Sequence, residues 1–298
     1  GIKSNNGAQA VDMRYLYGWW RVGNCRLLAG HTDNWFGSLA YHPMQYVGLN
    51  NNAHLLLFGW GLLWPHRVPQ VQFTYNTASW GVQFALEEPR QNSNLWGGTT
   101  TTYYTFPRAS LTFMFKAGSF MTHPGISYVK HQYQKADGST TADDSYDTWA
   151  VVLPIKFSVG AFTLKFQGHY GINFGGEYPF YPTTTGGADT RPLLVGGDVK
   201  DTTILGGFLS GEFAVGKAKI VGGFGYERFQ NDDGWTSANG YSKDENTRWG
   251  AFIAVPYQVT KNFGIHPEFS YYNWGDKPKT GADMGTEWIL GVEFRFIF

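Results

Sequence analysis

The sequence GVEFRFIF, residues 291–298, carries an apolar side chain at every second position. The apolar members of this pattern are Val292, Phe294, Phe296 and Phe298. Glu293 and Arg295 lie between them. Successive side chains of a β-strand point to opposite faces of the sheet, so the segment predicts a strand with one apolar and one charged face. Because chain ends usually fray, such a strict pattern at a terminus predicts a strand that closes a larger sheet.

The composition favours a membrane protein built from strands. Aromatic residues make up 18% of the chain and charged residues 15%, against roughly 25% charged residues in an ordinary soluble domain. No stretch approaches the ~18 consecutive apolar residues of a transmembrane helix. The formal net charge is zero, which argues against nucleic acid as a partner, since binding phosphates needs a basic surface.

Two-residue periodicity continues along the whole chain and predicts thirteen strands. Their ranges are 10–21, 24–36, 68–76, 79–88, 108–116, 119–133, 147–158, 161–174, 202–214, 217–230, 247–259, 262–275 and 286–298. Many exceed the five or six residues usual for soluble strands, and they bracket the roughly 9–11 residues that cross a bilayer. A secreted β-sandwich or jelly roll would explain the alternation but not these lengths.

Short and long connections alternate between the predicted strands. The short turns lie at 21–24, 76–79, 116–119, 158–161, 214–217 and 259–262. The long polar connections lie at 37–67, 89–107, 134–147, 175–201, 231–247 and 276–285. This asymmetry is typical of an up-and-down transmembrane β-barrel with short periplasmic turns and long extracellular loops. The sequence therefore predicts an all-β, antiparallel barrel formed by 1–298 as one domain.

Strand parity suggests a further strand. Bacterial single-chain barrels have even strand numbers, and the last strand must descend to the periplasm after its long loop. The strand at 10–21 then also descends, so we expect an ascending strand before it. The polar residues 1–10 are unsuited to it, which predicts a 14-stranded barrel whose first strand lies upstream of residue 1. The alternative is 16 strands, with additional strands hidden in 37–67.

The face opposite to the apolar one is unusually polar. Burying so many charges in a dry core would cost several kcal/mol each, so this face predicts a water-filled lumen. The predicted pore-lining residues are Asp12, Arg14, Glu87, Arg108, Lys116, Lys156, Lys165, His169, Glu212, Lys219, Glu227, Arg248, Glu268, Glu293 and Arg295. Basic rings favour anions, and the acidic members offset much of this effect. We therefore expect a weak anion preference.

Catalytic patterns are missing from the sequence. It contains no G-x-S-x-G, no H-E-x-x-H, no P-loop and no dinucleotide-binding fingerprint, so we expect no enzymatic activity. We expect no cofactor. Asp143, Asp144 and Asp147, and likewise Asp232 and Asp233, could hold Ca²⁺, although solvated loop charges explain them more simply.

Two segments carry a family resemblance. RYLYGWWRVGNCRLLAGHTDNWFGSLAY, residues 14–41, resembles the early hairpin of Gram-negative outer-membrane porins, most of all the group that includes DcaP-like channels. The strand ending in Phe298 is similar to the porin assembly signal, to which Phe294, Phe296 and Phe298 would belong. The general pattern covers essentially all 298 residues.

The resemblance implies a homotrimeric diffusion channel for small hydrophilic solutes and ions in a Gram-negative outer membrane. Membrane lipid, lipopolysaccharide and the barrel assembly machinery are its expected partners. In such porins one loop folds inward and narrows the pore. Two segments could do this, 89–107 and 37–67, and the second could instead form a subunit contact. A substrate-specific channel, for example for small carboxylates, is the main alternative, and an outer-membrane enzyme a weaker one.

Overall fold

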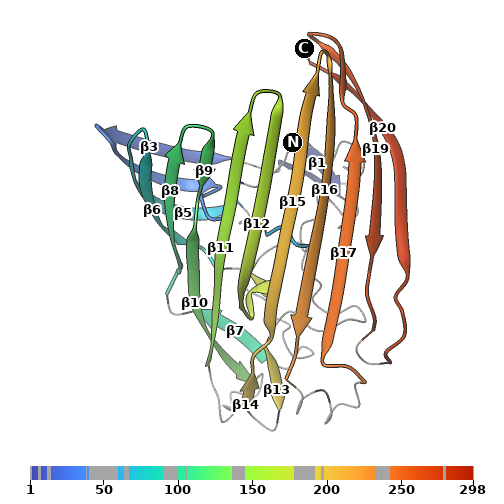
Figure 1. The fold of residues 1–298 in the computed structure, drawn as a ribbon. Helices are drawn as coiled ribbons and strands as arrows, with labels where there is room; N and C mark the ends of the chain where they lie inside the picture. The colour runs from blue at the N-terminus through green and yellow to red at the C-terminus, as the bar shows by residue number, and fades with distance from the viewer. Residues whose placement is uncertain are drawn as a thin grey trace.

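A computed structural model describes most of the chain. The described residues are 2–5, 8–11, 15–37, 39, 60–63, 67–89, 100–104, 106–135, 145–177, 192–195, 198–232, 236, 242–277 and 280–297. Most of them belong to one large antiparallel sheet, which Figure 1 shows as a curved wall. Among the described residues, no helix is long and apolar enough to cross a membrane.

The main sheet has sixteen strands. They are β3 (Leu16–Val22), β4 (Cys25–Thr32), β5 (Val68–Asn76), β6 (Trp80–Glu87), β7 (Thr100–Tyr104), β8 (Arg108–Ala117), β9 (Phe120–Thr122), β10 (Gly125–Lys135), β11 (Ser145–Val159), β12 (Phe162–Ile172), β15 (Thr203–Val215), β16 (Ala218–Gln230), β17 (Glu245–Ala254), β18 (Tyr257–Thr260), β19 (Phe263–Asn273) and β20 (Thr286–Phe296). The pairing is antiparallel throughout, with β3 and β20 at the two ends of the order.

These sixteen strands occupy thirteen positions across the sheet, because two consecutive strands share one position in three cases. The three cases are β7 with β8, β9 with β10, and β17 with β18. Pro107, Pro124 and Pro256 lie at the three breaks. Proline cannot donate a ladder hydrogen bond, so a strand tends to break there. The thirteen predicted strands are thus present, and β7 extends one of them into the predicted loop 89–107.

The N-terminal region differs from the prediction. The strand expected at 10–21 begins only at Leu16, and β1 (Ile2–Asn5) pairs instead with β2 (Ala8–Val11) in a separate two-stranded sheet. A second small sheet contains β13 (Leu193–Val195) and β14 (Asp198–Lys200). The strand predicted upstream of residue 1, and the additional strands considered within 38, 40–59 and 64–66, lie outside the described residues.

Four short turns share one glycine geometry. Gly23, Gly118, Gly160 and Gly216 have φ angles of 55°, 55°, 55° and 57°. Glycine adopts this left-handed conformation without a steric penalty, which explains why it recurs at the same place in these tight turns. Figure 1 shows the short turns together at one end of the wall, where β20 also ends.

Candidate functional site

The two faces of the wall differ in chemistry. We call one the outer face, which presents large exposed apolar side chains on nearly every strand. Examples are Val71, Phe73, Phe84, Leu153, Leu205, Leu209, Phe224, Ile253, Phe269, Leu290 and Phe294, each 41–69% exposed. Exposed apolar side chains over a whole sheet suit hydrocarbon as the surrounding solvent.

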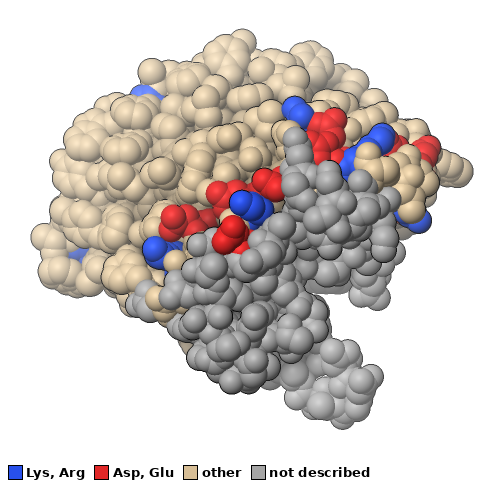
Figure 2. Space-filling view, turned by 90° about the horizontal axis from the view of Figure 1, so that it is seen from below, with Lys and Arg blue, Asp and Glu red and all other residues tan. Residues whose placement is uncertain are grey.

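The inner face carries polar and charged side chains at the intervening positions. Gln167 and Glu227 are fully buried there, whereas their outward-facing neighbours Phe166 and Tyr226 are 36% and 37% exposed. In Figure 2 acidic and basic side chains gather along one side of the tan wall. The alternation predicted from the sequence therefore separates an apolar surface from a polar one.

Thirteen of the fifteen residues predicted to line a pore are described. Six of them are buried: Glu87, Arg108, His169, Glu227, Arg248 and Glu268. Six are half-buried: Lys156, Lys165, Glu212, Lys219, Glu293 and Arg295. Lys116 is exposed beside a short turn. Asp12, Arg14 and the terminal Phe298 lie outside the described residues, whereas Phe294 and Phe296 are on the outer face, each 61% exposed.

Arg108 occupies a dense ionic network at the inner face. Its Nη2 lies 2.6 Å from Glu87 Oε2, and its Nη1 lies 3.2 Å from Glu177 Oε2. His131 Nε2 contacts the other Glu177 oxygen at 2.9 Å. Ser110 donates a hydrogen bond to Glu87. These ionisable side chains are almost completely buried, and their contacts connect β6, β8 and β10 to Glu177.

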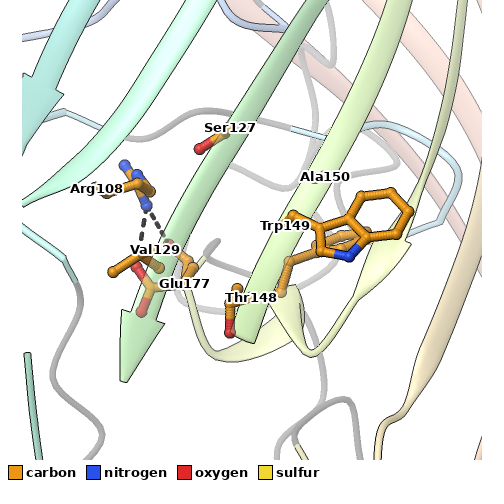
Figure 3. Close-up of a pocket in the computed structure, with 8 residues that line it drawn as sticks. Arg108, Ser127, Val129, Thr148, Trp149, Ala150 and Glu177 are labelled. Atoms are coloured by element: carbon orange, nitrogen blue, oxygen red, sulfur yellow. Dashed lines mark hydrogen bonds and ion pairs between the residues drawn. The ribbon is translucent and has the colours of Figure 1, made fainter. Parts of the chain in front are cut away.

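Glu177 reaches Arg108 because the chain folds inward after β12. The 3-10 helix η3 (Phe174–Gly176) follows Asn173, which has a φ of 58°. Asn173 Nδ2 donates to the Asp147 carbonyl at 2.9 Å, and its Oδ1 accepts from the Thr202 N–H at 2.9 Å. Figure 3 shows Arg108 pointing toward Glu177 across the strand that carries Ser127 and Val129. Two residues missed by the sequence analysis, Glu177 and His131, thus complete this network.

A second polar contact between buried side chains crosses the middle of the wall. His169 on β12 and Glu227 on β16 meet at 2.8 Å, although β15 lies between their strands. The residue between them in the pairing register is Gly206, and a Cβ there would lie 2.4 Å from the His169 ring. Gly206 therefore leaves the space in which this pair forms.

A short segment of the predicted loop 37–67 lies against this pair. Trp60, Leu62 and Leu63 are each 1% exposed. The Gly61 N–H donates to Glu227 Oε2 at 2.7 Å, and the Leu63 N–H donates to Gln167 Oε1 at 2.6 Å. Residues 60–63 are therefore fixed to the inner face by hydrogen bonds between their backbone and wall side chains.

Apolar clusters on the inner face accompany this segment. Leu63 belongs to a cluster with Phe36, Ala150, Val152, Phe174, Ile204 and Phe229. Trp60 and Leu62 belong to another with Phe208, Val221, Phe252 and Tyr272. The inner face is therefore not uniformly polar, because inward-folded segments cover apolar side chains in this part of the wall.

Glutamines form a polar ladder on β5 and β6. Gln72 Nε2 donates to Gln70 Oε1 at 2.8 Å, and Gln83 Nε2 donates to Gln72 Oε1 at 3.2 Å. Gln83 also accepts the Trp35 N–H at 2.7 Å. Sequence reasoning missed these residues because it weighed charged side chains, although the alternation in VPQVQFTYN at 68–76 places Gln70 and Gln72 on one face.

Lysines gather on the inner face towards the short turns. Lys156 on β11 lies directly opposite Lys165 on β12. Lys219 on β16 lies 2.7 Å from Glu212 on β15, so one carboxylate offsets part of this charge. At the wall's last strand, Glu293 contacts both His266 at 2.9 Å and Arg295 at 3.2 Å.

No group of three or more His, Cys, Asp or Glu side chains suited to a metal ion is found in the described part of the chain. Of the aspartates considered for Ca²⁺, Asp143, Asp144 and Asp233 lie outside it. Asp147 accepts a hydrogen bond from the Tyr128 hydroxyl at 2.8 Å.

Comparison with known proteins identifies the fold. No family model matches the sequence, and no curated protein matches it. Among solved structures, the outer membrane channel DcaP of Acinetobacter baumannii matches 90% of this chain and 71% of its own, at 16% identity and a TM-score of 0.66. The trimer form of OmpT, an outer membrane protein of Vibrio cholerae, matches 98% of this chain and 82% of its own, at 14% identity and a TM-score of 0.57.

An anion-selective porin from Comamonas acidovorans matches 92% of this chain and 75% of its own, at 9% identity and a TM-score of 0.50. At such identities the likeness establishes the fold and not the activity. The chain thus has the fold of Gram-negative outer-membrane β-barrel proteins, and its apolar outer face is that of a protein located in such a membrane.

Proposed function

We propose that this chain, which has the fold of Gram-negative outer-membrane β-barrels, is a porin-type channel for passive diffusion of small hydrophilic solutes and ions. The observation that carries the proposal is the contrast between an apolar outer face and an inner face of ionic pairs, glutamines and lysines. When the apolar face of such a sheet contacts lipid, the polar face encloses a lumen that water fills.

Single-channel recording in planar bilayers tests the proposal. The purified, folded protein is expected to give stepwise conductance in KCl, because hydrated ions can follow the polar inner face. A protein that inserts into the bilayer without any conductance would contradict the channel function.

We propose further that the channel has a weak preference for anions. The paired side chains of Arg108 and Arg248 contribute less to the lumen than the sequence alone suggests, since Arg108 contacts two carboxylates and Arg248 stacks over Trp60 and Phe229. Lys156 and Lys165 lie opposite each other on the inner face and contribute basic charge there. A reversal potential under a KCl gradient tests this preference, and clear cation selectivity would contradict it.

A substrate-specific channel is the second candidate. It is favoured by the segment 60–63, which hydrogen-bonds to Gln167 and Glu227 and adds apolar, closely packed side chains to the inner face. Block of ion current by a solute at low concentration supports this candidate. Conductance that is unaffected by a panel of small solutes supports general diffusion.

We propose the remaining properties on the same basis. The chain acts as one transmembrane domain, forms a homotrimer, contacts lipopolysaccharide, and enters the membrane through the assembly machinery by way of Phe294, Phe296 and Phe298. It has no enzymatic activity in this proposal.

Deleting Phe298 should lower the yield of assembled barrel while leaving the conductance of each assembled channel unchanged. Native mass spectrometry of the purified protein measures the number of subunits.

A further inference from the structure

The wall recognises the segment Trp60–Leu63 chiefly through its peptide backbone. Glu227 accepts the Gly61 N–H, and Gln167 Oε1 accepts the Leu63 N–H. Gln167 Nε2 also donates to the Leu63 carbonyl at 3.3 Å. Hydrogen bonds to the backbone of a peptide form whatever its side chains are, as in other modes of peptide recognition.

Two further features give this recognition a sequence preference. Trp60 packs edge-on against Tyr272 and Trp274, with ring centroids 5.1 and 4.8 Å away, and the Arg248 guanidinium lies 4.8 Å from its ring. Two aromatic rings and a guanidinium cation therefore surround the side chain at this position, which favours an aromatic residue there.

Gly61 supplies the second preference. It has a φ of +99°, and a Cβ on it would lie 2.0 Å from the Gly207 carbonyl oxygen and 2.5 Å from the Tyr226 nitrogen. Only glycine allows the bound backbone to approach the wall this closely. The matching sequence is therefore an aromatic residue followed by glycine and then by apolar residues.

We propose that this part of the inner wall is a binding subsite for short peptides with an aromatic residue followed by glycine, occupied in this structure by the chain's own Trp60–Leu63 segment. The inference rests on the proposed channel function, since a peptide from solution reaches the site through the lumen. Because it belongs to the same chain, this segment competes with any free peptide for the site. The site therefore binds free peptide weakly, as a channel needs if its ligand is to leave again.

The experiment replaces the chain's own segment by a peptide from solution. In Gly61→Ala the added Cβ prevents docking of the tethered segment, which leaves the subsite open. The probe is acetyl-Trp-Gly-Leu-Leu-amide, and the matched control is acetyl-Trp-Ala-Leu-Leu-amide, whose extra methyl group meets the same wall atoms. Single-channel recording measures current block, and fluorescence polarisation of labelled peptides measures binding to the folded protein in detergent.

We expect the glycine peptide to block and bind Gly61→Ala at least about tenfold more strongly than the original chain, because the tethered competitor is removed. The alanine peptide should neither block nor bind Gly61→Ala or the original chain. Replacing Gln167 by Leu in the Gly61→Ala background should abolish binding. Equal binding of the two peptides, or no binding to Gly61→Ala, would overturn the inference.

The outcomes separate the two proposals. Specific peptide binding without any conductance would contradict the channel function and leave the subsite standing. Conductance without peptide binding would contradict the subsite and leave the channel function standing. If Gly61→Ala does not fold, the peptide pair is compared on the original chain at concentrations of about millimolar, where free peptide competes with the chain's own segment. Stronger block by the glycine peptide then supports the inference, and equal block by the two peptides overturns it.

Discussion

His169 Nε2 lies 2.8 Å from Glu227 Oε1 across an intervening strand, directly above Gly206. Both side chains are fully buried, and the same carboxylate accepts the N–H of Gly61. One glycine without a side chain therefore allows the His169–Glu227 contact to form, and Glu227 in turn fixes a segment from a distant part of the chain.

Gly206→Ala should destabilise the protein. The new Cβ would lie 2.4 Å from the His169 ring and 2.6 Å from Glu227 Oε2, and overpacking of this kind costs about 1–3 kcal/mol. The midpoint of urea unfolding in detergent micelles measures the change. Gly207→Ala is the matched control, because the nearest atom to its Cβ is 3.8 Å away. Equal midpoints for the two variants would contradict the steric explanation.

Arg108→Leu should be more damaging. It leaves Glu87 and Glu177 buried without their shared cation, and breaking a buried ion pair costs roughly 3–5 kcal/mol. Arg228→Leu is the control, since the Arg228–Glu245 pair is 40% and 43% exposed and is expected to contribute no more than about 1 kcal/mol. Urea unfolding of both variants provides the comparison, and a similar loss in each would argue against a structural role for the Arg108 network.

The double variant Lys156→Gln, Lys165→Gln should move ion selectivity towards cations. The two lysines lie opposite each other on the inner face, so their neutralisation removes positive charge from the path of the ions. The reversal potential under a KCl gradient measures the shift. Lys261→Gln, at an exposed short turn, should leave it nearly unchanged. An unaltered potential in the double variant would show that these lysines do not set the preference.

Leu209→Arg should weaken folding into lipid. Leu209 lies near the middle of β15 on the outer face and is 47% exposed. Arginine at the centre of a bilayer-facing strand costs about 2–4 kcal/mol. Urea titration in lipid vesicles measures the loss, with Leu209→Phe as an apolar control that should be tolerated. If arginine were accommodated as well as phenylalanine, this surface would not face hydrocarbon.

The strands and their faces could be read from the sequence because both depend on neighbouring residues. The alternation around Phe294 and Phe296, and the glycines at Gly23 and Gly160, act within a few positions of the chain. Where prediction and structure differ, the cause is also local: Pro124 and Pro256 interrupt strands that the apolar pattern alone would continue.

The sequence by itself therefore determined the antiparallel wall, its apolar outer face and its polar inner face, since side-chain direction in a strand has a period of two residues. Only the tertiary structure decided which inner charges are paired and what covers them. Arg108 meets Glu177 across 69 positions, and the segment of Gly61 and Leu63 meets Glu227 and Gln167 across 166 and 104 positions. Such contacts depend on strand register and on inward folding of distant segments, which no local periodicity encodes.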